Sequence, residues 1–171
     1  TTGVCLIDGD RLLFPYCAYS GIAPDGSRGI YHGASIGLAI LRRDGFASLN
    51  AGEHRATLTT RPLQFSGRYL FVNVDCPQGE LRAEILDVDN QVIQPFTLEN
   101  SQTLSTDKTL VPLRWQGADD LSAVAGSPVR IRFHLKNGRL YSFWVSQHKT
   151  GESGGYLAAG SLGQTGIIDT K

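Results

Sequence analysis

Residues 129–136 read Val129-Arg-Ile-Arg-Phe-His-Leu-Lys136, an unbroken alternation of apolar with charged or polar residues. Because successive side chains of a strand project to opposite faces, this pattern predicts a half-buried antiparallel strand, with Phe133 in the core and Arg132 exposed. The pair Asn137-Gly138 follows, and it favours a type I′ turn, which needs positive φ at both central positions. We therefore expect residues 139–145 to return as the second strand of a β-hairpin.

Short strand signals recur at close spacing outside this hairpin. Residues 68–75 and 80–87 predict a second hairpin around the turn Cys76-Pro-Gln-Gly79. Residues 119–124 predict one helical turn, which the following Gly126 stops. Further short strands are expected at residues 57–63, 92–96 and 110–115. Together these signals predict an all-β fold, an antiparallel β-sandwich of the jelly-roll or lectin-like type.

The N-terminal part of the chain has a different pattern. Residues 11–19 and 36–41 predict two apolar strands separated by a glycine-rich stretch, and the second strand is apolar on both faces. Two strands cannot hold a core by themselves, so these must pack on the sandwich or on something outside this chain. An apolar face and an unpaired edge also favour self-association through residues 11–41. The tail, residues 150–171, is rich in Gly, Ser and Thr and predicts a surface strap.

The bulk composition excludes several classes of partner. The chain has 171 residues, enough for one domain or one domain plus a piece of another, and its formal net charge is zero. A neutral chain gives no reason to expect nucleic acid or an anionic membrane surface as a partner, because both are bound by clustered cations. The apolar runs fall far short of the ~20 residues that span a bilayer, and no signal peptide is evident.

Cysteine and histidine usage points to no metal and no cofactor. The three cysteines, Cys5, Cys17 and Cys76, form no C-x-x-C pair, so a zinc site is not expected. One disulfide with one free thiol and three buried thiols both remain open. The histidines share no spacing, and His134, on the polar face of its strand, is expected to be solvated. No nucleophile elbow, phosphate-binding loop or dinucleotide fingerprint is present.

Acidic residues offer two candidate sites, each with a simpler interpretation. Glycosidase chemistry needs two carboxyl groups about 5 Å apart, or ~6.5–9.5 Å apart, across one sugar. Asp8 and Asp10 could form such a pair with Asp25 nearby in sequence, but Asp8-Gly9-Asp10 is favoured as a plain turn. Residues 87–90, with two aspartates and an asparagine, could bind calcium, although a solvated turn is again favoured. We therefore predict no catalytic residue in this chain.

Aromatic and charged residues supply the remaining candidates. Sugar rings stack on exposed aromatic faces, and we take Trp115, Tyr141, Phe143 and Tyr156 as candidate carbohydrate-binding residues, with Tyr141 and Phe143 on one face of their strand. For any one aromatic a core role is the more common one. The charged cluster Arg42-Arg43-Asp44 is a candidate interdomain ion-pair cluster, and a solvated turn is the alternative.

The segment Ile36-Gly-Leu-Ala-Ile-Leu-Arg-Arg-Asp-Gly-Phe-Ala-Ser-Leu49 resembles a signature of secreted bacterial proteins similar to glycoside hydrolase families thirty-two and forty-three. In these proteins it lies where a five-bladed β-propeller ends and a C-terminal β-sandwich begins. Later segments resemble the rest of that sandwich in the same order, namely Leu58-Thr-Thr-Arg-Pro-Leu63, Tyr69-Leu-Phe-Val-Asn-Val74, Gly79-Glu-Leu-Arg82, Pro128-Val-Arg-Ile-Arg-Phe133, Leu140-Tyr-Ser-Phe-Trp144 and Gly155-Tyr-Leu-Ala-Ala-Gly160.

The resemblance implies a domain organisation and a role. Residues 1–46 would be a remnant of the last propeller blade and a linker, and residues 47–171 the C-terminal β-sandwich. The catalytic carboxylates of such enzymes lie in upstream blades, so the chain would be a non-catalytic accessory part that stabilises the propeller and contacts carbohydrate weakly. Its partners would be the propeller and an oligo- or polysaccharide, and its location secreted or periplasmic. One alternative is an autonomous carbohydrate-binding module. Another is an enzyme with an unrecognised site, although no group of residues in the sequence supports it.

Overall fold

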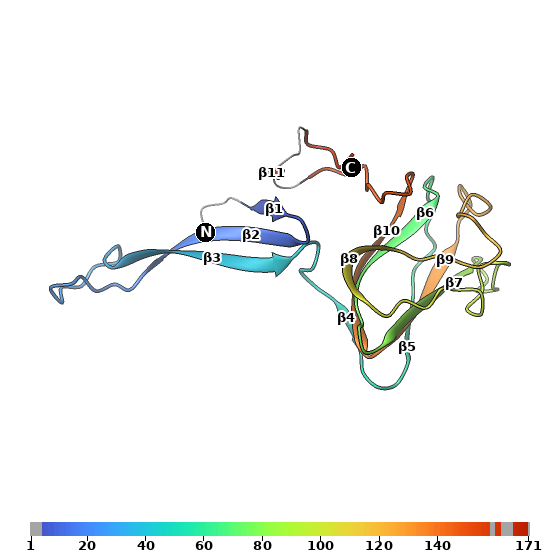
Figure 1. The fold of residues 1–171 in the computed structure, drawn as a ribbon, viewed down its shortest axis with the longest axis horizontal. Helices are drawn as coiled ribbons and strands as arrows, with labels where there is room; N and C mark the ends of the chain where they lie inside the picture. Colours follow the sequence, from blue (N-terminus) through green and yellow to red (C-terminus); the bar gives the residue numbers. More distant parts are fainter. Residues whose placement is uncertain (1–4, 158–159, 162–165, 171) are drawn as a thin grey trace. The chain divides into compact units, whose positions relative to one another are not determined.

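The computed structural model describes residues 5–157, 160–161 and 166–170, and within them the fold is all-β, without a helix (Figure 1). The strands are β1 (Leu6–Asp8), β2 (Arg11–Tyr19), β3 (Ala34–Arg42), β4 (Leu49–Ala51), β5 (Ala56–Thr59), β6 (Tyr69–Asp75), β7 (Glu80–Leu86), β8 (Asp107–Pro112), β9 (Arg130–Lys136), β10 (Gly138–Ser146) and β11 (Gly160–Ser161). They form three sheets, in the orders β11-β1-β2-β3, β4-β10-β6-β8 and β5-β9-β7. The predicted all-β fold is confirmed.

The chain divides into two compact units. The first holds the described residues within Thr1–Arg43 and Tyr156–Ile168, and the second those within Asp44–Gly155 and Asp169–Lys171. The tail after residue 155 therefore contributes to the first unit before it returns to the second. The domain limits predicted from sequence, at 1–46 and 47–171, remain a prediction about the parent protein.

The second unit is an antiparallel β-sandwich made of the sheets β4-β10-β6-β8 and β5-β9-β7. From β4 to β10, every strand lies in the opposite sheet from the strand before it, so each connection crosses from one sheet to the other, as in a wrapped jelly-roll-like sandwich. Alternate side chains of β6, β7 and β9 fill the space between the sheets. The largest fully buried side chains facing this core include Leu70, Val72, Leu81, Ile85, Phe96, Ile131 and Phe133.

Both predicted hairpins are wrong, although all four of their strands exist. The strand β9 pairs with β5 and β7, whereas β10 pairs with β4 and β6, so the two strands lie in different sheets. In the same way β6 pairs with β10 and β8, and β7 pairs with β9. Asn137 has a φ of 45°, but Gly138 does not adopt positive φ, so this pair forms a corner between sheets rather than a type I′ turn.

The glycines of these two corners serve close packing. A Cβ on Gly79 would lie 2.0 Å from the carbonyl oxygen of Lys136, and a Cβ on Gly138 would lie 2.5 Å from the Cβ of Cys76. Each corner thus presents a glycine to the backbone of the other corner. In the sequence these glycines indicated hairpin turns. In the structure glycine is required because the two chain segments approach too closely for a side chain.

Four smaller elements also differ from the predictions. Residues 92–96 form no strand; Val92 makes only an isolated bridge with Leu86, and the Gln94–Pro95 peptide bond is cis. Residues 119–124 form hydrogen-bonded turns rather than a helical element. The strands predicted at 57–63 and 110–115 are shifted toward the N-terminus, as β5 and β8. For the three predicted strands, local propensity misses where pairing in the sandwich begins and ends.

The strand β9 confirms the predicted core face and corrects the predicted outer face. Phe133 is 1% exposed, as expected for the core. The Arg132 side chain is only 30% exposed, and its Nη1 lies 3.1 Å from Oε1 of Glu84 on the neighbouring strand β7. His134, expected to be solvated, is 12% exposed, and its Nε2 lies 3.1 Å from the same carboxylate oxygen. Arg132 and His134 are partly buried on this face because both side chains contact the carboxylate of Glu84.

The first unit is built around a long ribbon in which β2 and β3 pair over nine residues each, from Arg11 opposite Arg42 to Tyr19 opposite Ala34. The two predicted apolar strands are thus present. The short strand β1 adds to the free side of β2 in antiparallel orientation, and β11 adds to β1 in parallel orientation. Neither β1 nor β11 was predicted from the sequence, because a strand of two or three residues is too short to show an alternation of apolar and polar residues.

Candidate functional site

Two of the four predicted carbohydrate-binding aromatics belong to the core of the sandwich. Trp115 is 6% exposed; its indole N–H donates to the carbonyl of Ala83 at 2.9 Å, and its ring meets the ring of Phe96 edge-on at 5.5 Å. Phe143 packs against the core, with its ring centroid 5.1 Å from that of Phe133. Both rings are thus used in packing of the core, Trp115 fully and Phe143 in part.

The other two candidates belong to different units. Tyr141 is half-buried on β10, at a bulge between Leu140 and Ser142 that breaks the alternation of the strand. Its hydroxyl accepts a hydrogen bond from the side chain of Arg139, which raises the pKa of that guanidinium. Tyr156 is 82% exposed and belongs to the first unit. The four aromatics are thus divided between the core of the sandwich, a bulge of β10 and the first unit, and their role in carbohydrate binding stays a prediction.

The charged cluster Arg42-Arg43-Asp44 lies where the first unit ends and the second begins. The backbone N–H of Arg43 donates to the carbonyl of Asp10 at 2.8 Å, which extends the β2–β3 ladder by one pair. Asp44 has a φ of 51°, and its carbonyl accepts from the side-chain amide of the buried Asn73 at 3.5 Å. These contacts fix the backbone at the boundary, and an interdomain ion-pair role stays a prediction.

The candidate carboxylates take structural roles. Asp8-Gly9-Asp10 turns the chain from β1 into β2 with Gly9 at a φ of 56°, and the Asp8 carboxylate forms an ion pair with Arg11 at 2.5 Å. Asp25 lies beyond the opposite end of β2, where the N–H and hydroxyl of Ser27 donate to its carboxylate and hold its pKa below the usual range. The ribbon therefore keeps Asp25 away from the other two, and the turn interpretation fits the geometry.

The predicted turn at residues 87–90 is likewise closed by its own backbone. The Asp87 carboxylate accepts from the N–H groups of Asp89 and Gln91, at 2.9 and 2.8 Å, in the manner of an Asx-turn. The described part of the chain holds no group of three His, Cys, Asp or Glu residues placed to bind a metal. The thiols of Cys5, Cys17 and Cys76 are unpaired in the structure, and burial raises the pKa of the Cys76 thiol.

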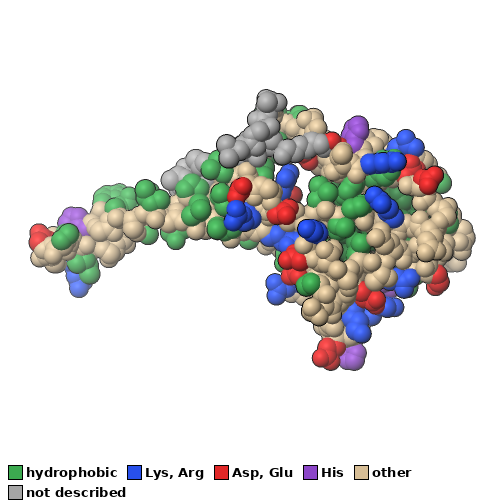
Figure 2. Space-filling model, viewed as in Figure 1, with side chains coloured by type: hydrophobic (Ala, Val, Ile, Leu, Met, Phe, Trp, Pro, Cys, Tyr) green, Lys and Arg blue, Asp and Glu red, His purple; other side chains and the backbone are tan. Residues whose placement is uncertain are grey.

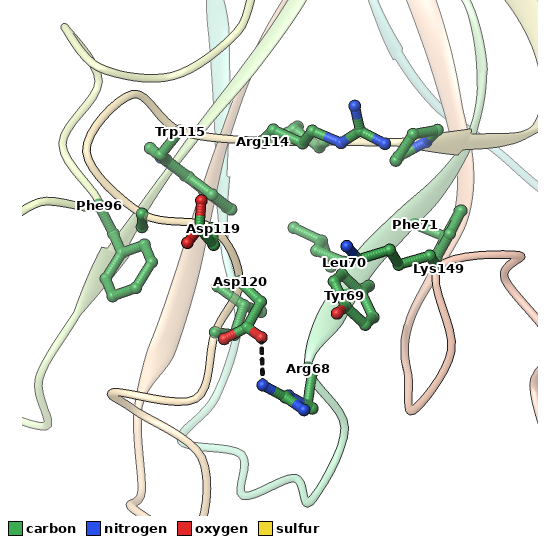
Figure 3. Close-up of a pocket in the computed structure, with 14 residues that line it drawn as sticks. Arg68, Tyr69, Leu70, Phe71, Phe96, Arg114, Trp115, Asp119, Asp120 and Lys149 are labelled. Carbon is green, nitrogen blue, oxygen red and sulfur yellow. Dashed lines mark ion pairs between the residues drawn. The ribbon is translucent and has the colours of Figure 1, made fainter.

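A small pocket of the second unit lies beside β6, between the rings around Trp115 and the Arg68–Asp120 ion pair (Figure 3). Arg68 approaches Asp120 at 2.8 Å, and hydrogen bonds from Ser122 keep the pKa of Asp120 low. The free volume is about 20 Å³, room for roughly one water molecule. A wider hollow of about 560 Å³ lies beside residues 64–67, where the carboxylate of Asp169 already accepts from Ser153. Among the described residues, no side chain that lines either hollow has a buried polar atom without a hydrogen-bond partner.

The clearest candidate site is an apolar surface of the first unit. Residues directly opposite in an antiparallel ladder project to the same face. The register therefore places Leu6, Leu13, Pro15, Cys17, Ile36, Leu38 and Ile40 on one face, which we call the Ile36 face. Ile36 is 86% exposed, Leu38 52% and Ile40 56%, and Figure 2 shows hydrophobic side chains open along this unit. Contiguous exposed apolar surface on a sheet indicates an interaction site.

The opposite face of the same sheet differs in its exposure. It carries Ile7 and Leu12, which are 8% and 6% exposed, and Tyr16, whose ring lies across Gly37. The sequence indicated that the strand at 36–41 needs cover on both faces. Beyond Ile7 and Leu12 the opposite face is open as well, with Tyr16 37% exposed, but the Ile36 face carries the most exposed aliphatic side chains of the described sheet, led by Ile36.

Comparisons with known proteins identify no relative. No family model matches the sequence, and neither the curated proteins nor the solved structures include a match. Among the described residues no helix is long and apolar enough to span a membrane. The glycoside hydrolase resemblance of the sequence therefore remains a proposal, to be judged on the geometry of the chain.

Proposed function

We propose that this chain is a non-catalytic accessory part of a secreted or periplasmic glycoside hydrolase-like protein, in which the first unit packs against the β-propeller of the same protein. In this proposal the sandwich is the stable body of the chain. The Ile36 face is the docking surface, and carbohydrate contact is secondary. The charged segment Arg42-Arg43-Asp44 then connects the docked sheet to the sandwich.

The single observation that carries the proposal is the open row Ile36, Leu38 and Ile40. Fully burying a large aliphatic side chain contributes roughly 1.5–3 kcal/mol, so three of them supply a substantial part of a stable interface. The strands β1, β2 and β3 pair antiparallel in chain order, as strands of a propeller blade do, and blades of a propeller pack on their neighbours through their faces. A sheet that is apolar on its open face fits that arrangement.

The candidate carboxylates predicted from the sequence take part in local turns, and the reaction class of the parent rests on the resemblance alone. The turn at Asp8-Gly9-Asp10 and the bonded Asp25 leave these carboxylates in structural use. The four aromatic candidates are spread over the core, a bulge and the other unit. A dedicated carbohydrate-binding surface is therefore not the better supported function.

The test uses the coding sequence that precedes residue 1 in the parent gene. The proposal expects that sequence to encode propeller blades; a different fold there would refute it. The propeller is then supplied as a separate polypeptide, and its affinity for this chain is measured by biolayer interferometry. We expect Leu38→Lys to weaken binding by about tenfold or more, because a charge would be buried in an apolar contact.

The matched control is Ser35→Lys, which places the same charge on the same exposed strand but on the opposite face. We expect this variant to bind the propeller within about twofold of the unchanged chain, a difference of a few tenths of a kcal/mol. Equal weakening by both variants, or no weakening by Leu38→Lys, would show that the Ile36 face is not the docking surface.

A further inference from the structure

The strand β3 is the outermost strand of its sheet among the described residues. It pairs with β2 on one side, and no described strand pairs with it on the other. Its sequence from residue 34 to 41 is uncharged, Ala-Ser-Ile-Gly-Leu-Ala-Ile-Leu. Natural edge strands are usually blunted by charge, proline or a bulge, and this one carries none of these before Arg42. It is open to another strand.

Two hydrogen bonds show which backbone groups of β3 face that open edge. Beyond one end of the ladder the N–H of Arg43 donates to the carbonyl of Asp10 at 2.8 Å, and beyond the other end the N–H of Ser20 donates to the carbonyl of Gly33 at 3.2 Å. Both couples continue the β2–β3 register, and both are hydrogen-bonded pairs. Bonded and non-bonded pairs alternate along an antiparallel ladder.

The pairs Leu13–Ile40, Pro15–Leu38 and Cys17–Ile36 are therefore the non-bonded ones. Pro15, which has no N–H to give, occurs in a pair of the type that needs none. It follows that the N–H and C=O groups of Ile36, Leu38 and Ile40 point away from β2, toward the open edge.

The sequence around Leu38 is nearly symmetric, with residues of similar size and polarity at equal distances before and after it. Isoleucine stands two positions before and two positions after it, and Gly37 and Ala39 are the small residues between. An antiparallel partner strand centred on Leu38 would thus meet its own sequence pattern. In that register Leu38 lies opposite Leu38, Ile36 opposite Ile40, and Arg42 opposite Ala34, so that no like charges oppose each other.

We propose that two copies of this chain form a symmetric dimer by pairing their β3 edges antiparallel about Leu38. The outward N–H and C=O groups of Ile36, Leu38 and Ile40 then all meet partners, because a directly opposed bonded pair exchanges two hydrogen bonds. The two-fold axis is perpendicular to the sheet, so the Ile36 faces of both copies join on one side. This dimer goes beyond the proposed function, since it uses the edge of the strand and the propeller uses its face.

Crosslinking tests the register in a chain with Cys5→Ser and Cys17→Ser as background. Directly opposed residues of a bonded pair have Cα atoms about 5.5 Å apart, within the range a disulfide can bridge. We expect Leu38→Cys to form a disulfide dimer under mild oxidation. Ile36→Cys and Ile40→Cys should crosslink with each other in a mixture, and neither with itself, because like positions would be separated by about four residues or roughly 13 Å.

Sedimentation velocity tests the edge itself. The unchanged chain should sediment as a dimer at about 100 μM, a protein concentration at which even a weakly associating dimer is populated. Leu38→Pro removes the central edge N–H, which the β2–β3 ladder does not use, and should give a folded monomer by circular dichroism. Leu38→Thr keeps that N–H and should still dimerise, although more weakly. A monomeric unchanged chain, a dimeric Leu38→Pro variant, or Ile36→Cys that crosslinks as well alone as with Ile40→Cys would each overturn the proposal.

Discussion

The two corners that join the sheets of the sandwich predict how the protein responds to a single added methyl group. Gly79→Ala would place a Cβ 2.0 Å from the carbonyl oxygen of Lys136 and 2.4 Å from that of Asn137. Both neighbours are backbone atoms, so they give way only if the whole corner between β9 and β10 moves. Overpacking of this kind costs typically about 1–3 kcal/mol, and we expect the free energy of unfolding to fall by that amount.

The reciprocal change is Gly138→Ala, whose Cβ would lie 2.5 Å from the Cβ of Cys76 and 2.8 Å from the carbonyl oxygen of Asp75. Each substitution pushes the same two corners apart. Once the first has separated them, the second meets less resistance, so the double variant should lose less stability than the two single losses combined. The coupling should fall in the range of roughly 0.5–3 kcal/mol seen for residues that share a backbone shift.

The matched control is Gly52→Ala, close to the same corner through its carbonyl, which accepts from the N–H of Asn137 at 2.8 Å. A Cβ on Gly52 would meet nothing within 4 Å, and its φ lies outside the left-handed region. This variant should keep its stability or gain about 0.4–1 kcal/mol. Urea unfolding followed by tryptophan fluorescence measures the four variants and the unchanged chain. If Gly79→Ala costs no more than Gly52→Ala, the corners do not pack as described.

The other predictions concern the core, the pH response and activity. Phe133→Ala should cost about 3–5 kcal/mol, because the ring is 1% exposed and packs against the tilted ring of Phe143; a loss under about 1 kcal/mol would contradict the assignment of the strand faces. Hydrogen bonding from Arg55 holds the pKa of Glu80 below its usual range, so its stabilisation is present above the unfolded pKa of about 4.3 and is lost as the pH falls through the lower folded pKa. The stability lost in Glu80→Gln should therefore be larger at pH 7 than at about pH 2.5 in urea unfolding, and an equal loss at both would refute the pairing. The chain alone should not hydrolyse sucrose, fructans, arabinans or aryl glycosides; turnover that Asp8→Asn abolishes would overturn the accessory role.

Local alternation predicted the strands of the sandwich better than it predicted their partners. The pattern around Phe133 correctly located β9 and its core face, because alternation depends only on one buried side. Which sheet a strand joins depends on contacts between distant segments. The Asn137-Gly138 pair is compatible with a tight hairpin, and equally with a corner whose glycine must admit Cys76. Sequence alone does not separate these two uses of glycine.

The candidate site was likewise predictable from the sequence only in part. The apolar run at 36–41 was readable because it lacks the polar alternation of a half-buried strand. The direction of its edge groups depends on its register against β2, which only the bonds at Asp10 and Ser20 reveal. Charged residues were the weakest part of the prediction. His134 looked solvated in sequence, yet it shares the Glu84 carboxylate with Arg132, a contact across two strands.

Hydrogen–deuterium exchange tests most directly whether the first unit is the surface by which this chain docks. The chain is measured alone and with the propeller supplied from the preceding coding sequence, at a few micromolar to keep self-association low. The account predicts slower exchange across β2 and β3 when the propeller is added, because docking on the Ile36 face excludes water there, and no change in β9 at the centre of the sandwich. Unchanged exchange in β3, or protection confined to the sandwich strands, would contradict it.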